Sequence, residues 1–274
     1  MRSLLSVRKA GHAGTLDPQA EGLLVLAFGK ATRLIRYLPL EPKVYEFTIQ
    51  FGTQTDTLDA EGTVTISGLP YPSVEDLTAL LPSFRGSQMQ VPPAYSALKV
   101  GGKRAYDLAR KGTPPDLQAR SINVENLVLL KYDTDAGRAT VSVTCSGGSY
   151  VRAFARDIAE KLGTSGFAAS IRRTRCGNFN LADALKPEQV DNTVQLTTPA
   201  EVFASLPAVQ ATEEMANAVT YGRDLYLNPR SVDAAERVML FRGSEMVAVL
   251  AKKGECFHPE LVLANPAEGD HANP

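Results

Sequence analysis

The order of hydrophobic and polar residues predicts strands and helices that do not alternate regularly. Residues 44–53, "VYEFTIQFGT", alternate apolar with polar side chains, as a half-buried strand does. Further strands are predicted over residues 121–133 and 138–145, joined around Asp135-Ala136-Gly137, and over short stretches of 237–263. In the last of these, Gly243-Ser244 has the composition of a hairpin turn.

Several segments place their apolar residues at helical spacing. In residues 149–163, Val151, Phe154 and Ile158 share one face, and Gly163 stands where a helix would end. The other predicted helices are residues 32–38, 73–84 with Ser73 as N-cap, and 212–222. Because strands and helices do not follow the regular spacing of β–α–β units, we expect an α+β fold. Its central sheet should be mixed and largely antiparallel, and a small β-rich domain should follow it.

Composition limits the class of protein. The chain has 274 residues, 44% of them hydrophobic, which suits one large domain or two modest ones. It contains no run of 18 apolar residues and no secretory h-region near the start, so we expect a cytoplasmic protein without a membrane partner. Cys145, Cys176 and Cys256 lie far apart, and neither His258 nor His271 has a second ligand at metal spacing. We therefore predict no metal.

Charge is distributed unevenly along the chain. Residues 1–178 hold 22 Lys and Arg against 16 Asp and Glu, whereas residues 179–274 hold 7 against 14. Such an asymmetry indicates a polyanionic partner for the basic part, although a solvated charged surface explains most clusters of this kind. The net charge of −1 therefore does not exclude a nucleic acid.

One polar stretch, "GHAGTLDPQAEGLL" at residues 11–24, places Asp17 between two glycine-rich turns. Aspartate is favoured at the N-cap of a helix and proline at the first helical position, so Asp17 could simply be an N-cap. Alternatively, a glycine-built loop could expose the carboxylate as a nucleophile, which requires an aromatic residue to hold a flat substrate and a cation beside the aspartate.

Five blocks of the sequence, in order, resemble the TruB family of tRNA pseudouridine synthases. They are "GHAGTLDPQAEGLLVLAFGKATR", "KVYEFTIQFGTQTDTLDAEG", "VPPAYSALKVGGKRAYDLARKG", "GGSYVRAFARDIAEKLGT" and "SIRRTRCGNF". Together they cover most of residues 7–180. The C-terminal β-rich stretch is similar to a PUA-type RNA-binding module. The resemblance implies the pseudouridine synthase fold and a uridine in tRNA, uridine-55 of the T loop, as the substrate.

The resemblance also implies roles for four residues. Asp17 matches the nucleophile that opens the N-glycosidic bond, by attack on C6 of the base or on C1′ of the ribose. Tyr45 matches the tyrosine that stacks on the target base, and Arg172 the arginine that pairs with the aspartate. His12 matches the histidine that fills the gap left by the flipped nucleotide, whose extrusion costs a few kcal/mol of stacking. Because the reaction is an isomerisation, no cofactor is expected.

Basic residues of the third block are candidates for phosphate contacts: Lys99, Lys103, Arg104 and Arg110. They would position RNA rather than read its bases, although exposed lysines usually serve solubility alone. The T stem-loop of tRNA is the expected partner. We expect no guide RNA, because the chain has no long basic extension. We expect a monomer, because the sequence shows no exposed apolar stripe.

We expect a catalytic domain over residues 1–200, a PUA-like module over 201–265 and a disordered tail over 266–274. The family begins with a strand and a helix ahead of the glycine-histidine loop. Only ten residues precede Gly11 here, so we expect the N-terminal segment of the family to be missing. Ser170 stands where many relatives carry a tyrosine.

Two other functions remain open on the sequence. A tRNA-binding or RNA-folding protein with weak catalysis would keep the basic surface and the C-terminal module. A hydrolase would need a nucleophile with its base, and the sequence contains no G-x-S-x-G elbow.

Overall fold

The computed structural model describes residues 4–263 except 97, 114, 229–231 and 233–234. The chain forms two compact units, and it passes between them four times. Unit 2 consists of Gly14–Val25 and Leu40–Ala184. Unit 1 takes the chain up to Ala13, Leu26–Pro39 and the chain from Leu185 onward. Each unit has its own sheet and its own hydrophobic core, so each is described by itself.

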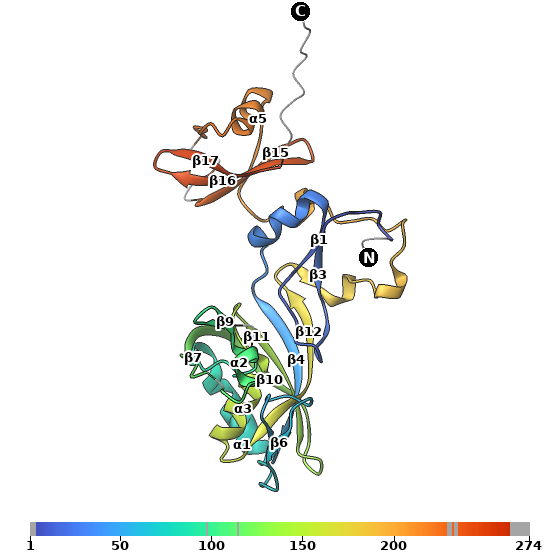
Figure 1. Cartoon of the computed structure of the whole chain (residues 1–274), viewed down its shortest axis with the longest axis vertical. Helices are drawn as coiled ribbons and strands as arrows, with labels where there is room; N and C mark the ends of the chain where they lie inside the picture. The colour runs from blue at the N-terminus through green and yellow to red at the C-terminus, as the bar shows by residue number, and fades with distance from the viewer. Residues whose placement is uncertain (1–3, 97, 114, 229–231, 233–234, 264–274) are drawn as a thin grey trace, which may run out of the picture. The chain divides into compact units, whose positions relative to one another are not determined.

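Unit 2 is built on a seven-stranded sheet (Figure 1). Its strands are β2 (Glu21–Gly22), β4 (Lys43–Phe51), β7 (Gly86–Gln90), β10 (Arg120–Asp133), β11 (Arg138–Cys145), β12 (Gly166–Cys176) and β13 (Phe179–Asn180). Six of them run antiparallel in the order β13-β12-β4-β11-β10-β7, and β2 lies parallel to β12. The prediction of a largely antiparallel mixed sheet is confirmed.

Helices pack on this sheet through the side chains that the alternating pattern singles out. On β4, Tyr45, Phe47, Ile49 and Phe51 are all buried. They form one core with α1 (Val74–Leu80), the 3-10 turn η2 (Leu81–Phe84) and α3 (Val151–Lys161). The predicted caps are present: Ser73 Oγ accepts from the Asp76 amide at the start of α1, and Gly163, with φ of 71°, follows α3. This core fixes both β4 and the start of α3.

Shorter elements complete unit 2. They are β5 (Gln54–Thr55), β6 (Val64–Ile66), β8 (Lys99–Val100), β9 (Lys103–Arg104), α2 (Ala105–Ala109) and the 3-10 turn η3 (Leu181–Asp183). The pairs β5–β6 and β8–β9 are small hairpins that stand outside the seven-stranded sheet.

Unit 1 contains the strand-rich C-terminal sheet that the sequence predicts. Four strands are paired in the order β14 (Ala208–Gln210), β15 (Arg237–Arg242), β16 (Glu245–Lys253) and β17 (Cys256–Val262). The same unit holds β1 (Ala10–Ala13), which pairs with β3 (Val25–Phe28), and η1 (Gly29–Tyr37), η4 (Pro187–Gln189), α4 (Pro199–Val202) and α5 (Glu213–Thr220). The turn at Gly243-Ser244 is confirmed. The helix expected over residues 32–38 is the 3-10 helix η1.

The two compact units do not divide the chain at residue 200, because segments on either side of unit 2 in sequence belong to unit 1. The division into a catalytic domain and a PUA-like module therefore stays a prediction about function. The predicted tail, residues 266–274, lies outside the described residues. Among the described residues, no helix is long and apolar enough to cross a membrane.

Burial on β4 gives a test of the unit 2 core. Phe47 is almost fully buried, whereas Leu130 on β10 is more than half exposed. Phe47→Ala should lower the free energy of unfolding by about 3–5 kcal/mol, because it removes a large side chain and leaves a cavity. Leu130→Ala should change it by less than about 0.5 kcal/mol. Urea denaturation measures both, and equal effects of the two variants would contradict the assigned core.

Candidate active site

Asp17 lies on a loop of unit 2 that begins at Gly14 and returns to the sheet at β2. The loop turns just after Asp17, where the Ala20 amide donates to the Asp17 carbonyl oxygen at 2.9 Å. No helix follows, so Asp17 is not a helix N-cap here. Its side chain is 36% exposed and therefore open to a reactant.

A buried arginine holds the Asp17 carboxylate from the first turn of α3. Arg152 donates from Nε to Oδ2 at 2.8 Å and from Nη2 to Oδ1 at 3.0 Å. Two parallel bonds of this kind fix the plane of a carboxylate as well as its position. Because the Arg152 side chain is only 5% exposed, water screens this ion pair weakly.

A second carboxylate, that of Asp59, faces the same guanidinium. Its Oδ2 lies 3.1 Å from Arg152 Nη1, and it is nearly as buried as the arginine. Asp59 is itself fixed, because its Oδ1 accepts from Thr57 Oγ1 at 2.5 Å and from the Glu61 amide at 3.1 Å. Arg152 therefore bridges an exposed carboxylate and a buried one.

Backbone oxygens complete the surroundings of Arg152. Nη1 donates to the Thr57 carbonyl and Nη2 to the Tyr95 carbonyl, both at 2.9 Å. An arginine has five N–H donors, and five oxygen atoms lie within 3.1 Å of its nitrogens. Each N–H donor of Arg152 therefore has an oxygen acceptor, which fixes the side chain in one orientation.

Tyr150 precedes α3 and belongs to the same surroundings. Gln90 fixes its backbone, accepting from the Tyr150 amide at 2.8 Å and donating to its carbonyl at 3.2 Å. Burial raises the pKa of the Tyr150 hydroxyl, and the charges of Arg120 and Arg152 oppose that rise whereas the charge of Asp17 adds to it. Tyr150 is also close to Arg152 in sequence, because it is the N-cap of α3.

Tyr45, on β4, is only 8% exposed. Burial raises the pKa of its hydroxyl, and the positive charge of Arg173 on the neighbouring strand β12 opposes that rise. The two residues are direct partners across the β4–β12 pair. Arg173 in turn reaches the loop of Asp17, since its Nη2 donates to the Gly14 carbonyl at 2.9 Å. The structure therefore connects Tyr45 and the Asp17 loop through one side chain.

Arg172 does not pair with Asp17, so the expected pairing is wrong. Its side chain is 52% exposed, and its Nε lies 3.8 Å from a carboxylate oxygen of Glu21. Successive residues of a strand point to opposite faces. Ile171 and Arg173 are buried, so Arg172 between them faces outward. A contact between Arg172 and a substrate stays a prediction.

His12 is exposed on β1 and belongs to unit 1, whereas Asp17 belongs to unit 2. The role of His12 beside a flipped nucleotide stays a prediction.

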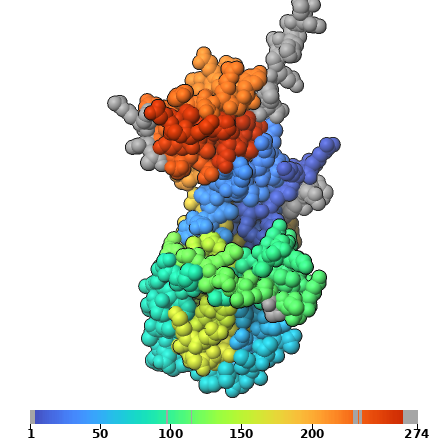
Figure 2. All heavy atoms as spheres, turned by 60° about the vertical axis from the view of Figure 1, so that its left-hand side comes forward, coloured from blue at the N-terminus to red at the C-terminus, as the bar shows by residue number. Residues whose placement is uncertain are grey.

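The four cations predicted to contact phosphates gather on one small feature. Lys99 on β8 is the cross-strand partner of Arg104 on β9, and Lys103 pairs with Val100. Arg104 and Arg110 both lie near the Tyr106 ring, at 5.8 and 5.7 Å from its centre. All four cations are exposed, and their segment, coloured green, lies on the surface in Figure 2.

Sequence reasoning missed Arg152, Asp59, Tyr150 and Arg173. A signal for Arg152 exists in the helix pattern, because at helical spacing it continues the apolar stripe through Ala155 and Ala159, both buried. A charged residue in such a stripe needs a buried partner. For Arg173 the signal is the alternation with Ile171, which selects it over Arg172 as the inward-facing arginine.

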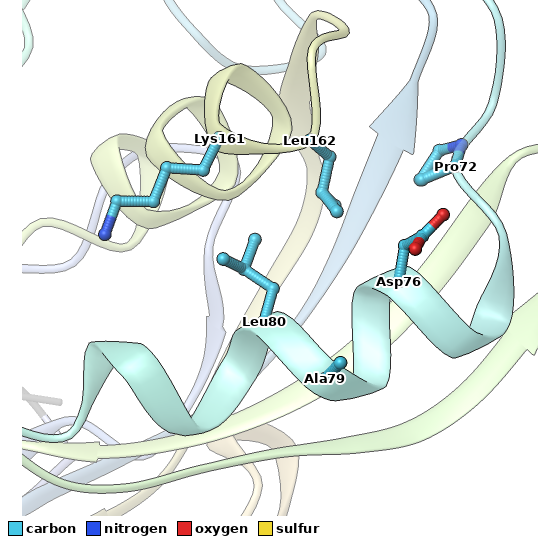
Figure 3. Close-up of a pocket in the computed structure, with 6 residues that line it drawn as sticks. All are labelled: Pro72, Asp76, Ala79, Leu80, Lys161 and Leu162. Atoms are coloured by element: carbon cyan, nitrogen blue, oxygen red, sulfur yellow. The ribbon is translucent and has the colours of Figure 1, made fainter.

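A hollow between α1 and α3 lies apart from these residues (Figure 3). It has a volume of about 450 Å³ and is lined by Pro72, Asp76, Ala79, Leu80, Lys161 and Leu162. None of these six residues is among those described above around Asp17 and Arg152. Among the described residues, no three His, Cys, Asp or Glu side chains are grouped to hold a metal ion, and the expected absence of a metal stays a prediction.

Comparison with known sequences identifies relatives over most of the chain. Residues 2–151 match the family model described as TruB family pseudouridylate synthase (N terminal domain). The chain is 44% identical over 235 residues to tRNA pseudouridine synthase B of Gluconacetobacter diazotrophicus, covering 83% of this chain and 76% of that protein. It is 40% identical over 278 residues to tRNA pseudouridine synthase B of Caulobacter vibrioides, covering 96% and 89%.

Comparison with solved structures agrees on the fold. A chain in the crystal structure of a Cbf5-Nop10-Gar1 complex matches with a TM-score of 0.67 and 22% identity, over 97% of this chain and 79% of that one. A chain in an H/ACA RNP bound to a substrate RNA containing 2′-deoxyuridine matches with a TM-score of 0.63 and 18% identity, over 97% and 80%. At such identities the likeness shows the fold alone.

The bridging role of Arg152 predicts an uneven response to mutation. Arg152→Met should lower the free energy of unfolding at neutral pH by about 3–5 kcal/mol, because it leaves the buried Asp59 carboxylate without its counter-charge. Adding Asp59→Asn should recover part of that loss. Arg172→Met, which removes an exposed ion pair, should cost no more than about 1 kcal/mol. Chemical denaturation measures all three, and no recovery in the double variant would contradict the bridge.

Proposed function

The chain belongs to the TruB family of pseudouridylate synthases, and from this premise we propose that it isomerises uridine to pseudouridine in tRNA. Relatives named tRNA pseudouridine synthase B are about 40% identical over nearly the whole chain, which supports this assignment. The observation that carries the proposal is the partly exposed carboxylate of Asp17, held in a fixed plane by a buried arginine.

Asp17 is proposed as the nucleophile. A carboxylate acts in this way when it is ionised and correctly positioned, and the two bonds from Arg152 supply the position. Asp17 forms a transient bond to C6 of the base or to C1′ of the ribose, and this bond breaks again before the product leaves. Between these events the C1′–N1 glycosidic bond breaks, the uracil turns, and a C1′–C5 bond forms. A proton leaves C5 and one is taken up at N1, so atoms and electrons balance without a cofactor.

Tyr45 and Arg172 are proposed to contact the target nucleotide, and His12 to occupy the space that this nucleotide leaves. Tyr45 carries an aromatic ring and a hydroxyl on β4, and β4 pairs with β12, the strand that also pairs with β2 at the end of the Asp17 loop. An aromatic face is a sequence-tolerant platform for an unstacked base. Uridine-55 in the T loop is the proposed target, because single-stranded loops present bases that can be turned out.

The proposed partner is tRNA alone, bound through its T stem-loop by a monomer in the cytoplasm. The β8–β9 hairpin supports a phosphate contact, because Lys99 and Arg104 are like charges placed directly across a strand pair. Such a pair is unfavourable by itself and is relieved by an anion. A guide RNA is not part of the proposal, because the relatives that match at about 40% identity are named for tRNA.

Single-turnover release of tritium from a C5-tritiated T stem-loop RNA tests the function. The unchanged protein should release tritium, and Asp17→Asn should release none while binding the RNA within about threefold of the unchanged affinity. Glu75→Gln, which alters an exposed carboxylate on α1, should release tritium at nearly the unchanged rate. Binding without release by the unchanged protein would favour the alternative of a tRNA-binding protein.

The four cations predicted to contact phosphates imply a change in salt dependence. Replacing Lys103 or Arg104 by glutamine should weaken binding of the same RNA and reduce the slope of log Kd against log salt by about 0.7–1 for each lost phosphate contact. Lys131→Gln, an exposed change on β10, should leave the slope unchanged. Filter binding between 50 and 200 mM salt measures the slopes, and equal slopes for all variants would remove these cations from the interface.

A further inference from the structure

We propose that Arg173 is a positioning residue that fixes the loop carrying Asp17 against the strand carrying Tyr45. The proposal rests on the proposed function. It explains how Asp17, as the nucleophile, and Tyr45, beside the target base, are held at a fixed distance from each other. The Arg173 side chain is fully buried and donates to backbone carbonyl oxygens of the Asp17 loop.

Arg173 binds the Asp17 loop at both ends. Its Nε donates to the Leu23 carbonyl at 2.8 Å, and its Nη2 donates to the Gly14 carbonyl at 2.9 Å. These two carbonyls lie on either side of Asp17 in sequence. One planar guanidinium therefore sets the distance between the two ends of the loop, because its nitrogens are rigidly spaced.

The backbone of Arg173 binds the loop as well. The Leu23 amide donates to the Arg173 carbonyl at 2.8 Å, and Arg173 is the register partner of Gly22 in the parallel β2–β12 pair. A Cβ on Gly22 would lie 2.3 Å from that carbonyl oxygen, and a Cβ on Gly14 would lie 3.0 Å from Nη1. Both glycines also have positive φ. The loop is thus built to lie directly against this arginine.

Tyr45 lies on the other side of the same residue. Arg173 and Tyr45 are partners across β4 and β12, where opposite side chains stand about 5 Å apart. The charge of Arg173 lowers the pKa of the Tyr45 hydroxyl against the larger effect of burial, which raises it. Arg173 is therefore the cross-strand partner of Tyr45, and its charge favours the ionised form of the Tyr45 hydroxyl.

The energetics favour a specific role over general stability. The side chain is 0% exposed, and one of its nitrogens, Nη1, has no hydrogen-bond partner among the described residues. A buried cation with incomplete partners is costly, and an apolar residue of similar volume at such a position is often neutral or stabilising. Retaining an arginine here is therefore better explained by geometry that a leucine or methionine cannot supply.

Two substitutions of similar volume test the proposal. Arg173→Lys keeps the charge but replaces the two rigidly spaced nitrogens by a single one, and Arg173→Met removes both the charge and the bonds. Arg175→Met is the matched control on the same strand, because Arg175 is exposed and also donates to a backbone carbonyl, that of Gly177 at 2.7 Å. Thermal unfolding and the affinity for the T stem-loop RNA establish that each variant is folded and binds.

The expected result is a loss of rate without a matching loss of affinity. Single-turnover tritium release should fall about 10- to 100-fold in Arg173→Lys and further in Arg173→Met, because a displacement of about 1 Å can cost 100-fold in rate. The Kd should change less than threefold, and Arg175→Met should match the unchanged protein. A rate for Arg173→Lys within twofold of the unchanged protein would overturn the proposal.

Titration of Tyr45 gives a readout that does not depend on turnover. With 3-fluorotyrosine incorporated and the Tyr45 signal assigned through Tyr45→Phe, ¹⁹F spectra against pH report the ionisation of this hydroxyl. Arg173→Met should raise its pKa, since the phenolate loses a neighbouring cation, and Arg173→Lys should raise it less. An unchanged Tyr45 titration in Arg173→Met would overturn the link between the two residues.

The two readouts separate this proposal from the proposed function. If the unchanged protein releases no tritium, the proposed function fails, and the link from Arg173 to Tyr45 is still decided by the titration. If Arg173→Met does not fold, Arg173→Lys decides the proposal by the same rate and titration criteria.

Discussion

The position of the Asp17 carboxylate depends on one buried guanidinium, that of Arg152. Removing an arginine from water is expensive unless its donors and its charge are matched, and here five oxygen atoms meet its nitrogens. Asp59 supplies a buried counter-charge, so Arg152 is neutralised from within the protein. The second carboxylate, that of Asp17, can then remain partly exposed and available to a reactant. A fixed and accessible carboxylate is what a nucleophilic site requires.

Two arginines on neighbouring elements stabilise the same loop by different means. Arg152, on α3, acts through carboxylates and orients a side chain. Arg173, on β12, acts through backbone carbonyls and orients the chain itself. The loop of Asp17 has no helix or long strand of its own, so its shape comes from these partners. Phe47 shares one hydrophobic core with residues of both α3 and β12, the elements that carry these arginines.

Much of the fold could be predicted from the sequence, because periodicity of apolar residues is a local property. The alternating apolar and polar residues of β4, the apolar stripe of α3 and the turn at Gly243-Ser244 are all visible in the sequence. The partner of Asp17 could not be predicted in the same way. Arg172 and Arg173 are adjacent in sequence but face opposite sides of β12, and Arg152 lies on another element, α3. Asp17 was found through its glycine-rich loop, whereas Arg152 depends on a contact between residues 135 positions apart.

The four passages of the chain between the two units also impose an order on biosynthesis. All residues of unit 2 have been made once Ala184 leaves the ribosome, so this unit can fold while translation continues. Unit 1 cannot, because its first segments must wait for the strands after Leu185. In the interval, Leu34 on η1 lacks its core partners Phe203 and Met239, whereas the bridge from Asp17 to Arg152 can already close. The nascent chain thus acquires its proposed chemical centre before the protein is complete.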